Sequence, residues 1–190
     1  MVHIKETLIS TCLIALLALS PTAAYAKSEA KMSADSLVEQ VEVVKDTLRQ
    51  IEEEQEAQRI AEERAAIGSA IADASYWTAS TGYGLCAAWV SSVYQNAGYG
   101  YVGGNACDMF WSWCTSSDYS NLAPGMLIAV PSHTLTSAGR IYGHVGIITY
   151  HDGQWFVRHN IGYIAEDTLE TWIATYSTTY TPRWGFAAGI

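Results

Sequence analysis

Three residues in the C-terminal part of this chain have the types and the order expected of a thiol hydrolase. Cys86 is followed 58 residues later by His144, and His159 lies 15 residues beyond that. A cysteine becomes a strong nucleophile only as the thiolate, so it needs an imidazole to take its proton, and the imidazole needs a polar partner to orient it. We therefore predict Cys86 as the nucleophile, His144 as the base and His159 as the third catalytic residue, with Asn160 as the alternative third residue.

The segment around Cys86 indicates how the sulfur is placed. Apolar residues recur at helical spacing from Leu85 to Ala97, and Gly98 ends the pattern, so Cys86 falls in the first turn of a helix. Unpaired backbone N–H groups and the positive end of the helix favour a thiolate there. The N–H of Cys86 and a hydroxyl group of Tyr83 or Tyr76 are candidates for holding the oxyanion or the substrate.

The rest of the C-terminal part is dominated by patterns typical of strands. Apolar stretches bounded by turn residues predict strands at Met126 to Val130, Ile141 to Tyr150, Gln154 to Ile161 and Trp184 to Ala188. A helix that carries the nucleophile and precedes an antiparallel sheet is an α+β arrangement.

The dipeptide Asp152-Gly153 predicts how the two histidines meet. A two-residue turn there sets His159 opposite Gly146, and because side chains alternate along a strand, His144 and His159 then share one face. A three-residue turn that includes His151 would instead set His144 against Asn160 and send His159 to the far side. Asp-Gly favours the shorter turn.

Composition divides the chain at about Gly68. Residues 27–67 hold eleven acids against six lysines and arginines, with no aromatic residue, glycine or proline, whereas residues 68–190 hold all seven tryptophans. The first segment is predicted to be an acidic helical spacer or short coiled coil, because apolar residues recur with heptad spacing between Leu37 and Ile51. Self-association or a partner protein bound through residues 35–67 is one possible role, and a regulatory arm over the active site is another. The second segment is the predicted catalytic domain.

The N-terminus has the pattern of a secretory signal. Lys5 precedes an apolar stretch, and Ala24-Tyr25-Ala26 provides the small residues that a signal peptidase reads, so residues 1–26 are the predicted signal peptide. A lipid anchor at Cys12 is the rival interpretation. We expect a secreted, extracellular or wall-associated protein with no stable membrane insertion after cleavage. The net charge of −9 disfavours nucleic acid as a partner.

The remaining cysteines and histidines could form a disulfide or a metal site. A disulfide between Cys107 and Cys114 stays open, because export permits it but a helix between the two residues would hold them too far apart. His133 and His151 are predicted in exposed loops, and the histidine spacing does not match that of common zinc sites. We expect neither a metal nor another cofactor.

Four motifs in one order resemble a known family. They are Gly84-Leu85-Cys86-Ala87-Ala88-Trp89-Val90, then Leu122-Ala123-Pro124-Gly125-Met126-Leu127, then Gly143-His144-Val145-Gly146-Ile147, and then Val157-Arg158-His159. Over roughly Ser75 to Ile173 they resemble the NlpC-type cell-wall cysteine peptidases, which share a papain-like fold with the CHAP amidases. The resemblance implies a peptidoglycan hydrolase with Cys86 as nucleophile, His144 as base and His159 as the third polar residue.

The resemblance leaves the cleaved bond open. Leu85 and Ala87-Ala88 stand where many members have an acid before the cysteine and Ser-Gly after it, and Met126 replaces a frequent acid. Our first expectation is an endopeptidase that cuts amide bonds of the peptidoglycan stem peptide through an acyl-enzyme. The alternatives are an N-acetylmuramoyl-L-alanine amidase of the CHAP type and a non-catalytic secreted protein that binds the wall or serves as a scaffold.

Overall fold

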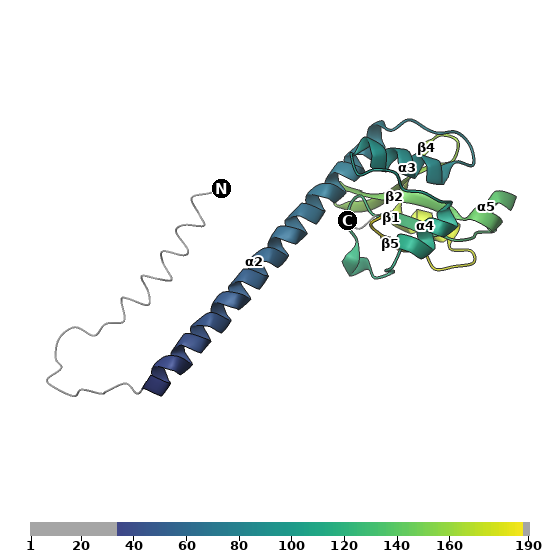
Figure 1. Ribbon diagram of the computed structural model, residues 1–190. Helices are drawn as coiled ribbons and strands as arrows, with labels where there is room; N and C mark the ends of the chain where they lie inside the picture. Colours follow the sequence, from purple (N-terminus) through teal and green to yellow (C-terminus); the bar gives the residue numbers. More distant parts are fainter. Residues whose placement is uncertain (1–33, 188–190) are drawn as a thin grey trace. The chain divides into compact units, whose positions relative to one another are not determined.

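The computed structural model describes residues 34–187, and the predicted signal peptide and Cys12 lie outside this range. The chain divides into two units, one ending at Gln50 and the other beginning at Ile51. The helices of the described residues are α2 (Ala34–Trp77), α3 (Cys86–Asn96), α4 (Ala106–Trp113), α5 (Ser137–Tyr142) and α6 (Leu169–Tyr176) (Figure 1). The strands are β1 (Leu127–Val130), β2 (His144–His151), β3 (Gln154–Asn160), β4 (Ile164–Thr168) and β5 (Arg183–Gly185).

Helix α2 extends beyond the predicted acidic segment. It runs without interruption through the unit boundary and through Gly68, where the composition changes. Val41, Val44, Leu48 and Ile51 of the predicted heptad pattern are all substantially exposed. The packing that normally stabilises a long helix is therefore missing along this stretch. Of the helices that the structure describes, none has the length and apolar character needed to cross a membrane.

The second unit is built on one antiparallel sheet, which confirms the α+β class. The strand order is β4-β3-β2-β1-β5. Alternate residues of the central strands face two apolar cores: Leu127 and Ile147 pack with α3 and α4, whereas Ile128 and Ile148 pack with α6. Helices on both faces thus bury the sheet between two layers.

The β2–β3 hairpin has the shorter of the two predicted turns. His151 pairs with Gln154, and His159 pairs with Gly146. Asp152 and Gly153 both have positive φ, as a two-residue type I′ turn requires. The prediction that His144 and His159 share one face is confirmed.

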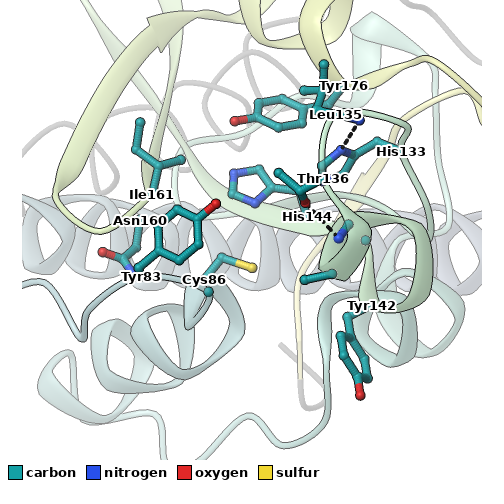
Figure 2. A pocket seen from close by; sticks show the side chains of 14 residues that line it. Tyr83, Cys86, His133, Leu135, Thr136, Tyr142, His144, Asn160, Ile161 and Tyr176 are labelled. Atoms are coloured by element: carbon teal, nitrogen blue, oxygen red, sulfur yellow. Dashed lines mark hydrogen bonds between the residues drawn. The ribbon is translucent and has the colours of Figure 1, made fainter.

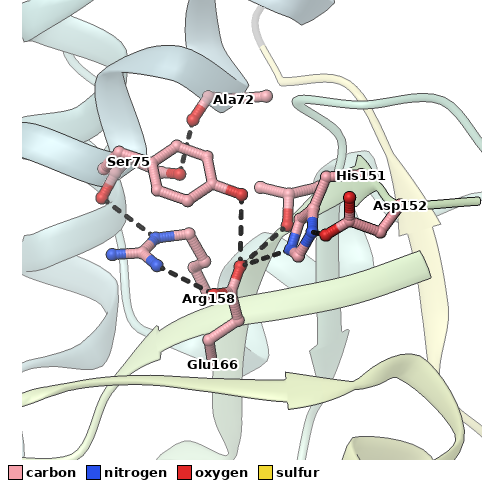
Figure 3. Close-up of polar contacts among 8 residues, drawn as sticks. Ala72, Ser75, His151, Asp152, Arg158 and Glu166 are labelled. Atoms are coloured by element: carbon pink, nitrogen blue, oxygen red, sulfur yellow. Dashed lines mark hydrogen bonds and ion pairs between the residues drawn. The ribbon is translucent and has the colours of Figure 1, made fainter. Parts of the chain in front are cut away.

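The opposite face of the same strands carries a polar cluster centred on Glu166 (Figure 3). Arg158 lies 3.3 Å from the carboxylate, and the Tyr76 hydroxyl donates a hydrogen bond to it at 3.2 Å. His151 is the third neighbour, with Nε2 at 3.3 Å. Arg158 also donates to the Ser75 carbonyl at the C-terminal end of α2. The cluster therefore ties the end of α2 to β2, β3 and β4.

Two strand predictions and the loop prediction for His151 need correction. Ile141 and Tyr142 end α5 rather than starting a strand, and Thr136 caps this helix by accepting a hydrogen bond from the Gly139 N–H. Gly143 then turns the chain into β2 with a φ of 73°, and a Cβ at this position would lie 2.0 Å from the Val130 oxygen. The last strand covers only Arg183–Gly185. His151 belongs to the end of β2 and to the cluster on Glu166, not to an exposed loop.

The question of the disulfide is settled by α4. Cys107 lies in its first turn and Cys114 follows its last residue, and both are free thiols. Cys114 is buried, and this burial raises its pKa to about 12. It packs as a small apolar residue in the core.

We predict that Gly146→Ala destabilises the second unit by about 1 to 3 kcal/mol, because the added Cβ would lie 2.5 Å from Val157 and 3.1 Å from His159. Thermal unfolding followed by circular dichroism measures this. Gly103→Ala is the matched control, since its Cβ would meet only the exposed Tyr101 ring. Equal melting temperatures for the two variants would contradict the close packing at Gly146.

Candidate active site

Cys86 is the first residue of α3, as predicted, but its thiol is not held as a thiolate. No side chain caps this helix end, so the first backbone N–H groups remain available. Burial, the largest effect, raises the pKa of Cys86, while the N–H groups of Val145, Ala87 and Cys86 itself lower it. The net direction is upward, which corrects the expectation that the helix end alone favours a thiolate. Burial therefore favours the thiol over the thiolate at Cys86.

Asn160 does not orient the base. Its Nδ2 donates to the Gly82 carbonyl at 2.6 Å, and its Oδ1 accepts from the Ser80 hydroxyl at 2.6 Å. These bonds fix the loop that leads into Cys86. Asn160 is thus excluded as the partner of His144 in this structure, and its contacts position the nucleophile instead.

His144, His159 and Asp167 form a hydrogen-bonded chain. Nε2 of His144 lies 2.8 Å from Nδ1 of His159, and Nε2 of His159 lies 3.1 Å from the Asp167 carboxylate. A carboxylate only accepts, so the neutral His159 carries its proton on Nε2 and accepts at Nδ1. His144 must then donate from Nε2, which leaves its Nδ1 unprotonated. This is the tautomer in which His144 can act as a base through Nδ1.

The surroundings keep His144 neutral. Its ring stacks on Tyr176 at 4.3 Å and lies 6.0 Å from Trp172, both from α6. Burial lowers the pKa of His144 well below 6.5, and positive charge on His159 or His133 would lower it further. Burial also lowers the pKa of His159, which Asp167 partly offsets. The base is therefore available at neutral and mildly acidic pH.

Sulfur and imidazole line the same cavity. Cys86 packs with the apolar core on the α3 side of the sheet, whereas His144 packs against α6 on the other side. His144 is the first residue of β2, and the two layers of side chains meet at this end of the sheet. Both side chains line a cavity with a volume of about 280 Å³, and Figure 2 shows them among its lining residues. The Val145 N–H that acts on the sulfur belongs to the residue next to His144. The thiol and the imidazole therefore lie near one another at the start of β2.

Of the two tyrosines predicted to hold the oxyanion or the substrate, only Tyr83 lines the cavity. Tyr83 lines the cavity and is largely exposed, so its hydroxyl can reach a substrate. Tyr76 is wrong as an oxyanion donor, because its hydroxyl binds Glu166 and its ring packs under Arg158.

Two residues of the site were not predicted. Asp167 was missed because Ile164 to Thr168 has too polar a pattern to mark a strand, although a carboxylate eight residues after His159 was a usable signal. His133, predicted in an exposed loop, is 4% exposed and lines the cavity 6.1 Å from the His144 ring. Its burial comes from Gly139 of the next helix, α5, and from Tyr176 of α6, which is distant in the sequence. Across residues 34–187, no three histidine, cysteine, aspartate or glutamate side chains are arranged to hold a metal ion.

Comparisons with known proteins add no assignment: no family model, curated protein or solved structure matches this chain.

We predict that Asp167→Asn lowers the turnover number about tenfold or more, because an amide can donate to His159 and allow the wrong His144 tautomer. Nitrogen NMR of the two imidazoles should show Nε2–H on His144 in the native protein and mixed tautomers in the variant. Glu170→Gln, in the exposed first turn of α6, is the control and should change neither measurement. An unchanged imidazole spectrum in Asp167→Asn would refute the positioning role.

We also predict that alkylation of Cys86 by iodoacetamide in the absence of substrate rises with pH through a midpoint higher than that of a free thiol. The reason is that burial raises the pKa of Cys86, so the thiolate forms only at higher pH. Peptide mass spectrometry separates Cys86 from the partly exposed Cys107. A midpoint below 7 would mean that a thiolate and imidazolium pair exists at rest.

Proposed function

We propose that this protein is a secreted cysteine peptidase that cuts amide bonds in the stem peptide of peptidoglycan. The observation that carries the proposal is the chain from Asp167 through His159 to His144, beside a thiol at a helix N-terminus in one cavity. Packing alone does not require a cysteine, two histidines and a carboxylate in this arrangement, whereas a nucleophile, a base and groups that orient the base are the parts that nucleophilic catalysis uses.

The proposed reaction starts from the neutral pair. When a carbonyl group binds beside Cys86, Nδ1 of His144 takes the thiol proton as Sγ bonds to the carbonyl carbon. The N–H of Cys86 at the start of α3 holds the resulting oxyanion, with Tyr83 as a further donor. His144 then gives its proton to the leaving amine, and the acyl group stays on the sulfur as a thioester.

Water completes the cycle by the same route. His144 removes a proton from a water molecule that attacks the thioester carbon, the C–S bond breaks to release the acid product, and His144 returns its proton to the departing sulfur. His159 and Asp167 hold the imidazole in one tautomer during both halves and stabilise its positive charge. The residues present supply every proton transfer in this scheme.

The substrate class rests on the sequence resemblance. The four ordered motifs resemble NlpC-type peptidases, and the five-stranded antiparallel sheet with a nucleophile helix is compatible with their papain-like fold. Export through the predicted signal peptide would bring the protein to the wall. An amidase of the CHAP type uses the same residues on a different bond, so the products must distinguish the two.

We predict that the purified protein releases fragments from peptidoglycan and that Cys86→Ala and His144→Ala release none above background. Loss of the nucleophile or base removes the covalent route, which lowers the rate by several orders of magnitude. Mass spectrometry of the new termini identifies the bond: a cut inside the stem peptide supports the endopeptidase, and a lactoyl terminus free of peptide indicates the amidase. Equal fragment patterns from native protein and Cys86→Ala would leave only a binding role.

A further inference from the structure

The cavity at Cys86 is walled on one side by a single segment. Residues 133–143 lie between β1 and β2 and include α5. The lining residues from this segment include His133, Leu135, Thr136, Ala138, Gly139 and Tyr142. Tyr83, Ile161 and Tyr176 face them from other elements (Figure 2).

No formal charge faces this cavity from the described residues. Its lining contains no aspartate, glutamate, lysine or arginine. Arg140, the one cation in the segment, is exposed on α5 and is not part of the lining. A carboxylate entering the cavity would lose hydration without meeting a cation, which strongly disfavours its binding.

His133 is held rigidly in this wall. Gly139 packs against its ring so closely that a Cβ there would lie 2.1 Å away, and the ring edge meets Tyr176 with centroids 5.2 Å apart. The Leu135 N–H donates to Nδ1 at 3.3 Å. Nδ1 is therefore the acceptor of a neutral ring, and Nε2 carries the proton.

Nε2 of His133 makes no hydrogen bond to any other described residue, although the side chain is only 4% exposed and lines the cavity. Burial lowers the pKa of His133, so the ring stays neutral at pH 7. A neutral donor in an apolar wall suits an uncharged oxygen acceptor.

We propose that this cavity selects an uncharged acyl residue, one of whose oxygens accepts a hydrogen bond from Nε2 of His133. The inference rests on the proposed peptidase function. On the acyl side of the cleaved bond of a stem peptide, the cavity favours a residue in which a primary amide replaces the free carboxylate. His133 and Leu135 are then the residues that determine specificity.

The test compares two synthetic stem peptides that differ only in this group, a free carboxylate in one and its primary amide in the other. We expect kcat/KM to be at least about tenfold higher for the amide peptide, because a site without a matching charge rejects the ion. Leu135→Arg should reduce this preference about tenfold by improving the carboxylate peptide. Leu135 is largely exposed, so this change does not disturb the core.

Two further variants make the test specific. Ala174→Arg adds the same charge to the exposed side of α6, outside the cavity lining, and should leave the preference as it is in the native protein. His133→Ala should lower kcat/KM for the amide peptide, and His133→Gln should restore part of it through the amide donor. Similar rates on both peptides, or a preference for the carboxylate, would overturn the specificity alone. Cleavage of neither peptide would overturn the proposed function as well.

Discussion

The antiparallel register of β2, β3 and β4 is the constraint on which the site depends. Because side chains alternate, neighbouring residues of β3 and β4 serve opposite faces: Arg158 and Glu166 pair on one face, and His159 and Asp167 on the other. A slip of one residue would exchange these pairs between the faces. The two-residue turn at Asp152-Gly153 thus fixes both the attachment of the C-terminal end of α2 to the sheet and the orientation of the His144 imidazole.

Much of this arrangement can be predicted from the sequence because it depends on interactions between residues that are close along the chain. Helical spacing placed Cys86 at a helix start, and an Asp-Gly turn with strand alternation placed His159 beside His144. The same rules failed where tertiary packing decides. His133 is buried by Gly139 and Tyr176, which no local pattern predicts, and Asp167 lies in a strand that is stabilised by pairing with β3 rather than by apolar alternation.

Asn160 illustrates why the sequence left two registers of the β2–β3 hairpin open, one with His159 beside His144 and the other with Asn160 there. It directly follows His159, so either residue was a reasonable partner for the base. In the observed register Asn160 faces the loop before α3 and binds Ser80 and Gly82. Of these two consecutive residues of β3, His159 therefore orients the His144 imidazole, and Asn160 fixes the loop that leads into Cys86.

The burial of the Cys86 thiol has a consequence for its oxidation. Peroxides and disulfides react with thiolates far faster than with thiols. Because burial raises the pKa of Cys86, it also lowers the fraction of sulfur that can be converted to sulfenic acid. The enclosure that opposes ionisation of Cys86 therefore also favours its reduced form.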